Sequence, residues 1–200
     1  MNMEKMMKSF ARKCSLILVV AAGWTVLSGT LLADDTNAPK TKLEAFEAQI
    51  GVTIVKGSVL IGSVNAQNGV VSIRCKESKD ADTDRKESGL AIEVREGEVQ
   101  ADTTVIDYDE LDAFLNAIDY VSKVDYRVTT LPSFDVVYTT KGGLKIAAYS
   151  STRSPGTIQA ALHSNHTTNT RVLLSPQQLA RFQSLIQESK AKLDSLRAGK

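Results

Sequence analysis

The sequence is poor in the residues that build disulfide frameworks and metal centres. Two cysteines and two histidines occur among its 200 residues. Cys14 lies in an N-terminal apolar run that is expected to be removed, which leaves Cys75 without a partner for an internal disulfide. His163 and His166 have no cysteine beside them, and a structural zinc site needs four ligands. The fold must therefore be stabilised by packing.

Sequence motifs of catalysis are also missing. The chain has no Gly-x-Ser-x-Gly segment around a nucleophilic serine and no glycine-rich loop that could hold a phosphate. The carboxylates between Asp107 and Asp112 are better explained by the start of a helix, where the helix dipole stabilises negative charge. We therefore expect neither an enzyme nor a bound cofactor.

The N-terminal region has the layout of a secretory signal. Four basic residues and one acidic residue occupy the first thirteen positions, and no charged residue follows until Asp34. A basic head, an apolar middle and a small residue before a polar segment are typical of a cleaved signal, here ending at Ala33. The alternative is an uncleaved membrane anchor, for which the run is long enough. We expect a signal peptide at 1–33, a polar leader at 34–49, and a periplasmic or secreted protein.

Charge is divided unevenly along the rest of the chain. Residues 50–125 contain 15 acidic and 8 basic side chains, whereas residues 126–200 contain 3 acidic and 10 basic ones. This division predicts either two halves that attract each other or a basic face that meets an acidic partner.

The two halves follow one pattern, because residues 50–125 and residues 126–200 each read as four strands followed by an amphipathic helix. The expected strands are 52–65, 70–77, 89–96 and 103–106, then 127–139, 144–150, 157–165 and 171–174. Turns are expected at 68–69, 141–143 and 154–156, a polar loop at 78–88, and a short helical turn at 43–47.

Both helices are expected to begin with a reciprocal capping box. Asp107 and Glu110 form the first box. Ser175 and Gln178 form the second, and Pro176 suits the first helical position after it. The apolar stripes expected to face inward are Leu111, Phe114, Leu115, Ile118 and Val121 in one helix, and Leu179, Phe182, Leu185, Ile186 and Leu193 in the other.

A shift of 68 positions aligns the two helices, laying Phe114 on Phe182, and favours duplication of one unit. The sequence thus predicts an α+β fold of two ββββα repeats, with antiparallel sheets packed on two amphipathic helices. This order of elements resembles the Pur and Whirly single-stranded nucleic-acid-binding folds, in topology alone. The resemblance implies two intertwined units that exchange helices, and it carries over no functional residue. The residues are also similar to uncharacterised secreted bacterial proteins, which implies no activity.

The best candidate for a binding surface is the outward face of the second sheet. Alternation predicts that Lys145 and Tyr149 point away from the helices, with His163 beside them on the next strand. Ala147, Gln159 and Ala161 complete this face. Such a flat face with few charges can take a ligand, and we expect Lys145, Tyr149 and His163 to bind one. The alternative is a sheet face that is simply wet.

A second candidate is a loop in which Asp80, Asp82 and Asp84 alternate with other residues. Calcium prefers oxygen ligands, so three such carboxylates indicate a weak calcium site. Arg85 stands where the calcium-binding loop has a glycine, however, and Ala91 where it has the closing glutamate. The pattern favours a solvated hairpin tip over a metal site.

Together these features predict an exported, non-catalytic binding protein whose partner is an unknown protein or small ligand. Single-stranded nucleic-acid binding is an alternative, supported by topology and the basic second half but opposed by export and by the slight excess of acid in residues 34–200. A small enzyme or inhibitor with its site in loops is the other alternative.

Overall fold

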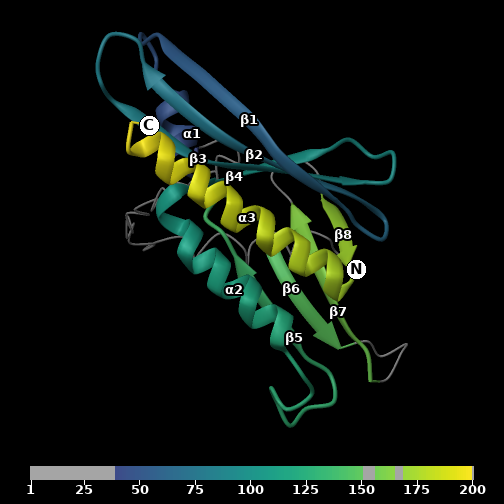
Figure 1. Ribbon diagram of the computed structural model, residues 1–200. Helices are drawn as coiled ribbons and strands as arrows, with labels where there is room; N and C mark the ends of the chain where they lie inside the picture. Colours follow the sequence, from purple (N-terminus) through teal and green to yellow (C-terminus); the bar gives the residue numbers. More distant parts are fainter. Residues whose placement is uncertain (1–38, 151–155, 165–168, 200) are drawn as a thin grey trace, which may run out of the picture. The chain divides into compact units, whose positions relative to one another are not determined.

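The computed structural model describes residues 39–150, 156–164 and 169–199 (Figure 1). The expected signal peptide and residues 34–38 of the expected leader therefore lie outside the described residues. The described chain is α+β, with two four-stranded antiparallel sheets and helices, consistent with two ββββα units. In both sheets the strands lie side by side in the order of the sequence. The predicted fold class is confirmed.

The first sheet is built from long strands joined by tight turns. Its elements are β1 (Ile54–Asn65), β2 (Gly69–Asp80), β3 (Lys86–Glu96) and β4 (Asp102–Asp107). The expected turn at Asn68-Gly69 is present, and the Ala66 N–H donates to the Gly69 carbonyl at 2.8 Å.

The predicted polar loop at 78–88 is wrong at both ends. Strand β2 continues to Asp80 and β3 begins at Lys86, with Lys79 paired with Lys86. Ser78 and Ser88 are both buried, but on opposite faces of the sheet. Ser78 lies on the outer face, which a short N-terminal helix covers, whereas Ser88 lies on the inner face with Leu90 and Ile92. Burial on both faces favours strand for residues whose polarity alone indicated a loop.

The second sheet has shorter strands. Its elements are β5 (Asp135–Thr139), β6 (Lys145–Ser150), β7 (Ile158–Ser164) and β8 (Thr170–Leu174). The expected strand at 127–139 is formed only at its end. Its first half is a loop, in which the Asp125 carboxylate binds Arg127 at 2.6 Å and Tyr126 packs edge-on against Phe134. The turn at 141–143 is present, with Gly143 at φ 96°, whereas residues 154–155 of the third expected turn lie outside the described chain.

The two helices lie side by side between the sheets and are exchanged between the units (Figure 1). Helix α2 (Leu111–Lys123), from the first unit, packs on β5 and β6, and helix α3 (Pro176–Arg197), from the second, packs on β1 and β2. The rings of Phe114 and Phe182 meet edge to face, with centroids 6.1 Å apart. Of the residues predicted to face inward, Leu115 is half-buried and the others are buried in one shared core.

The capping prediction is confirmed for α3 and wrong for α2. The Ser175 hydroxyl accepts from the Gln178 backbone N–H at 3.2 Å, and the side-chain Oε1 of Gln178 accepts from the Ser175 backbone N–H at 2.7 Å. Asp107, by contrast, precedes a turn of 3-10 helix, η2 (Tyr108–Glu110), and makes no cap bond. The Glu110 carboxylate instead accepts from the Lys141 N–H of the second unit at 2.9 Å. The two carboxylates that the sequence pattern assigned to a local cap are thus hydrogen-bonded to residues far away in the sequence.

Each unit places its first hairpin turn against the fourth strand of the other unit. Gly69 adjoins Val172 of β8, and Gly142 adjoins the backbone of Val105 in β4. An added Cβ at Gly142 would overlap the Val105 carbonyl oxygen. The two glycines occupy equivalent places in the units, so only the absence of a side chain lets the units approach.

The short helix α1 (Lys42–Glu47) covers the outer face of the first sheet. Thr41 caps it through a reciprocal box with Glu44, and the Asp107 carboxylate accepts from the Leu43 N–H at 3.1 Å. At its other end, Glu47 accepts from the Ser78 hydroxyl at 2.7 Å. Leu43 and Phe46 are buried against this face, apart from the shared core. Within the described residues, no helix covers the outer face of the second sheet.

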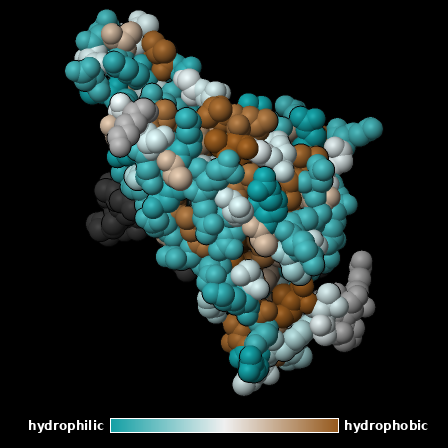
Figure 2. All heavy atoms as spheres, in the orientation of Figure 1, coloured by the Kyte–Doolittle hydropathy of each residue, from teal (hydrophilic) through white to brown (hydrophobic). Residues whose placement is uncertain are grey.

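Exposed apolar side chains form separate groups on a largely hydrophilic surface (Figure 2). One group lies on β1 and a second lies around the end of α2, the following loop and β5. The exposed apolar residues of these groups are Val55, Val59, Leu60, Tyr120, Tyr126, Val128, Leu131 and Val137.

Candidate functional site

Strand register brings the predicted site residues together on the outer face of the second sheet. Lys145 on β6 lies directly opposite His163 on β7, and His163 lies opposite Arg171 on β8. Neighbouring strands are about 4.8 Å apart, so these three side chains form a row about 10 Å long across the sheet. We call Lys145, His163 and Arg171 the cationic row. Tyr149 lies on the same face, opposite Gln159.

A hollow of about 380 Å³ lies on this face. The cationic row lines one side, Ala147 forms its floor, and Asp135 and Tyr149 lie on the other side with Val137. The predicted placement of Lys145, Tyr149 and His163 is therefore confirmed, while their role as ligand-binding residues stays a prediction.

Arg171 is a residue of this hollow that sequence reasoning missed. Its guanidinium lies over the Tyr149 ring, 4.7 Å from the centroid, and donates to the Tyr149 hydroxyl. The Tyr149 hydroxyl in turn donates to the Gln159 side-chain carbonyl at 3.1 Å. The alternation of Arg171 with the buried Val172 was the signal that could have placed it on the outer face.

The cationic row is electrostatically strained around His163. Burial, together with the charges of Arg171 and Lys145, lowers the pKa of His163, and the carboxylate of Glu96 opposes this effect. Burial is the largest cause, and the like charges at the directly opposed strand positions add to it by disfavouring the protonated imidazole.

The two permanent charges of the row have no ion-pair partner among the described residues. By contrast, Lys76 on the outer face of the first sheet pairs with Glu47 at 2.9 Å. The Nε of Arg171 is buried without a hydrogen-bond partner in the described chain. A buried donor of this kind costs about 1–3 kcal/mol when it is left unsatisfied.

The corresponding row of the first sheet has a different composition. Ile73 pairs with Ile92 in the first sheet as Ile146 pairs with Leu162 in the second. The residues beside them in the first sheet are Ser72, Glu93 and Thr103, which share one register row. Duplication alone therefore does not account for the cationic row, because the equivalent positions contain no basic residue.

The aspartates of the expected calcium loop are held in a local turn. Asp80 accepts from the Asp82 N–H at 3.0 Å and from the Thr83 hydroxyl at 2.7 Å. The bond from Thr83 is the main reason that the pKa of Asp80 is lowered. Asp84 is fully exposed and lies 3.9 Å from the ammonium group of Lys79. Among the described residues, no group of three or more acidic, histidine or cysteine side chains could hold a metal ion. His166 lies outside them.

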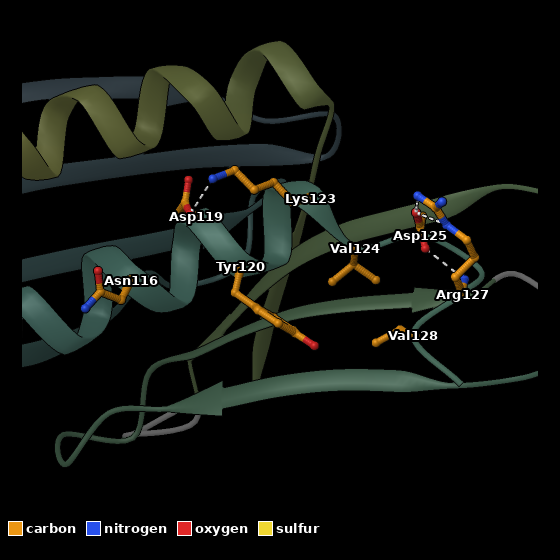
Figure 3. A pocket seen from close by; sticks show the side chains of 8 residues that line it. All are labelled: Asn116, Asp119, Tyr120, Lys123, Val124, Asp125, Arg127 and Val128. Carbon is orange, nitrogen blue, oxygen red and sulfur yellow. Dashed lines mark hydrogen bonds and ion pairs between the residues drawn. The ribbon is translucent and has the colours of Figure 1, made fainter. Parts of the chain in front are cut away.

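A second hollow, of about 420 Å³, lies at the C-terminal end of α2 (Figure 3). Its four charged residues form two internal ion pairs, Lys123 with Asp119 at 2.7 Å and Arg127 with Asp125 at 2.6 Å. Tyr120 points across the hollow toward Val128. Because its charges already satisfy one another, this hollow offers a charged ligand less than the face of the second sheet does.

Comparisons of the chain with protein-family models, with curated proteins and with solved structures found no match. In the part of the chain that the structure describes, no helix combines the length and the apolar character needed to cross a membrane.

Proposed function

We propose that the chain is an exported, non-catalytic binding protein whose ligand docks on the outer face of the second sheet. The observation that carries this proposal is the hollow of about 380 Å³ on a sheet face that no helix covers within the described residues. Ligand sites are concave, mostly apolar and equipped with a few convergent polar groups. The hollow has this character, with Ala147 and Val137 beside Lys145, Tyr149 and Arg171.

The lack of a catalytic arrangement supports the non-catalytic part of the proposal. Among the described residues that line the hollow, the only imidazole is that of His163, and burial together with two neighbouring cations lowers its pKa and so makes it a weaker base. General-base catalysis at a hydroxyl nucleophile needs a base oriented by a third group. The hydroxyl nearest to Arg171, that of Tyr149, is occupied by two hydrogen bonds. Turnover of an ester, peptide or glycoside substrate that persists through purification would contradict this part.

Binding can be tested by chemical-shift mapping. The ¹⁵N-labelled protein is titrated with a panel of sugars, amino acids, carboxylates and phosphates, and we expect shifts at the amides of residues 145–149 and 159–163. An Ala147→Trp variant, which fills the hollow, should abolish the shifts. Arg74→Trp is the matched control, because Arg74 is exposed at the equivalent position of the first sheet. Shifts that map elsewhere, or that survive in Ala147→Trp, would contradict the proposed site.

Export can be tested separately by mass spectrometry of the mature protein. The basic N-terminal segment and the uncharged run that follows support cleavage after Ala33. Recovery of the intact chain from the cytoplasm would contradict export without affecting the binding site.

Single-stranded nucleic-acid binding is a second candidate function. It is favoured by the coexistence of three basic side chains and the Tyr149 ring on one sheet face, since such proteins combine basic grooves with stacking rings. Arg171 already stacks on that ring, however, and would have to move to admit a base. Retardation of a labelled oligonucleotide that weakens steeply with salt would support this function.

A further inference from the structure

The cationic row is a specific feature of the second sheet that packing does not require. Lys145 and Arg171 flank His163 on adjacent strands, where like charges repel. Neither cation has an ion-pair partner in the described chain, and the equivalent row of the first sheet contains no basic residue. The placement of these two cations beside His163 thus costs free energy in the unliganded protein, and an anion on this face would offset that cost.

The guanidinium of Arg171 has a hydrogen-bond donor that the described chain does not use. One of its terminal nitrogens donates to Tyr149, while its Nε has no partner in the described chain. A guanidinium can bind a carboxylate or phosphate through two parallel N–H groups, which recognises two oxygens of one anion. Such an anion would satisfy the orphaned Nε as Arg171 turns from the ring toward the hollow.

Two acidic groups, Glu96 and Asp135, lie near the row. The two carboxylate oxygens of Glu96 accept from the side-chain amide of Asn68 and from the backbone N–H of Arg171, each at 3.0 Å. Asp135 lies on the opposite side of the hollow and makes no ion pair with the row. Two carboxylates thus lie near the two permanent charges of Lys145 and Arg171, so an anion would be held by directed hydrogen bonds from these side chains and not by an excess of positive charge.

We propose that the outer face of the second sheet binds a small anion with at least two negatively charged oxygens, a carboxylate or a phosphate, between Lys145, His163 and Arg171. This inference deepens the proposed function and depends on it, because it names the ligand class of the same hollow. The apolar floor at Ala147 and Val137 would contact the uncharged part of the ligand.

The test titrates the labelled full chain with citrate, with inorganic phosphate, with neutral glucose and with a single-stranded oligonucleotide. Citrate or phosphate should shift the amides of residues 145–149, 159–163 and 170–172. The affinity should fall about tenfold in Lys145→Gln and in Arg171→Gln, since each variant removes one charge-assisted contact. Arg74→Gln, which removes an exposed charge from the first sheet, is the matched control and should bind as the parent does.

A further variant keeps the test informative if Arg171→Gln fails to fold. Asp135→Asn should tighten binding of either anion, because it removes the opposing charge of the hollow. Equal affinity of the parent and Asp135→Asn, together with equal affinity of Lys145→Gln, would overturn the proposal.

The choice of probes distinguishes the proposal of an anionic ligand from the broader proposal that this face binds a ligand. Glucose binding to this face without anion binding would leave the binding function standing and overturn the anionic ligand. Oligonucleotide binding without any response to citrate or phosphate would also overturn it, in favour of nucleic acid. If no probe perturbs this face, the anionic ligand proposed here is overturned, whereas the broader binding function fails only if its wider ligand panel also leaves the face unperturbed. Comparison of the affinities for citrate and for phosphate then shows whether the cationic row prefers a carboxylate or a phosphate.

Discussion

Replacement of Gly142 by alanine should destabilise the protein strongly, because this residue is the point where the second unit meets the first. An added Cβ would overlap the Val105 carbonyl oxygen and lie 2.9 Å from Cγ2 of Thr104. Val105 is strand backbone in β4, between β3 and the second unit, so it cannot move aside as a flexible side chain would. Overpacking typically costs about 1–3 kcal/mol. Because backbone is involved here, we expect a cost at the upper end of that range.

Gly57 is a matched control, because replacing it by alanine is expected to stabilise the protein. At Gly57 in β1 an added Cβ would meet nothing closer than the Glu77 carbonyl oxygen at 3.9 Å. Alanine there restricts the unfolded chain without strain in the folded one, which stabilises by about 0.4–1 kcal/mol. Gly69→Ala should behave like Gly142→Ala, since its Cβ would overlap the Arg95 carbonyl oxygen and lie 2.8 Å from Cγ1 of Val172.

Urea denaturation followed by circular dichroism measures these differences. We expect the unfolding midpoints of the Gly142→Ala and Gly69→Ala variants to fall well below that of the parent, and the midpoint of Gly57→Ala to equal or exceed it. If all three variants unfold at the same urea concentration, the close approach of hairpin and strand between the units is wrong.

Three further predictions concern the shared core, the buried thiol and the cationic row. A chain ending at residue 125 should stay unfolded by circular dichroism, and fold when residues 126–200 are added, because α3 supplies the cover of β1 and β2; independent folding of the first half would contradict the exchange of helices. Burial raises the pKa of the Cys75 thiol to about 11, so this thiol should react with a chromogenic disulfide reagent only after addition of urea, with Cys75→Ser as the blank. Because the pKa of His163 is lowered from 6.5, the unfolded chain binds a proton there more readily, and stability should fall as pH decreases below about 6.5 and level off below the folded pKa. Thermal melts of His163→Gln should show a smaller loss between pH 7 and pH 5, and an identical loss would contradict the electrostatic strain.

Patterns of period two and period 3.6 predicted the elements whose faces are clearly divided. Leu144, Ile146 and Ala148 recur at every second position, so the outward placement of Lys145 and Tyr149 could be inferred before the register was known. The stripe of α3 was equally clear, and its cap at Ser175 depends only on residues three apart in the chain. Local geometry dominates at these positions, and local sequence was therefore sufficient.

Contacts between distant residues account for the errors. Asp107 lies three residues before Glu110, as a capping box requires, yet its carboxylate accepts from the Leu43 N–H, 64 residues away. The strand end at Ser78 is likewise stabilised by Glu47 of α1. Arg171 was missed because its partner, Tyr149, lies two strands away. Such pairings follow from the arrangement of the sheets, which periodicity alone does not specify.

The difference between Asp107 and its counterpart also explains why one sheet face is covered and the other open. The 68-residue shift lays Asp107 on Ser175. The carboxylate of Asp107 reaches the first amides of α1 and anchors that helix on the first sheet. The shorter hydroxyl of Ser175 is committed to the cap of its own helix and has no reach for another segment. One partner of Glu47 on the first sheet is Lys76, and a 73-residue shift lays that lysine on Tyr149. The second unit thus lacks these two contacts, and within the described residues no helix covers its outer face, where we propose that a ligand binds.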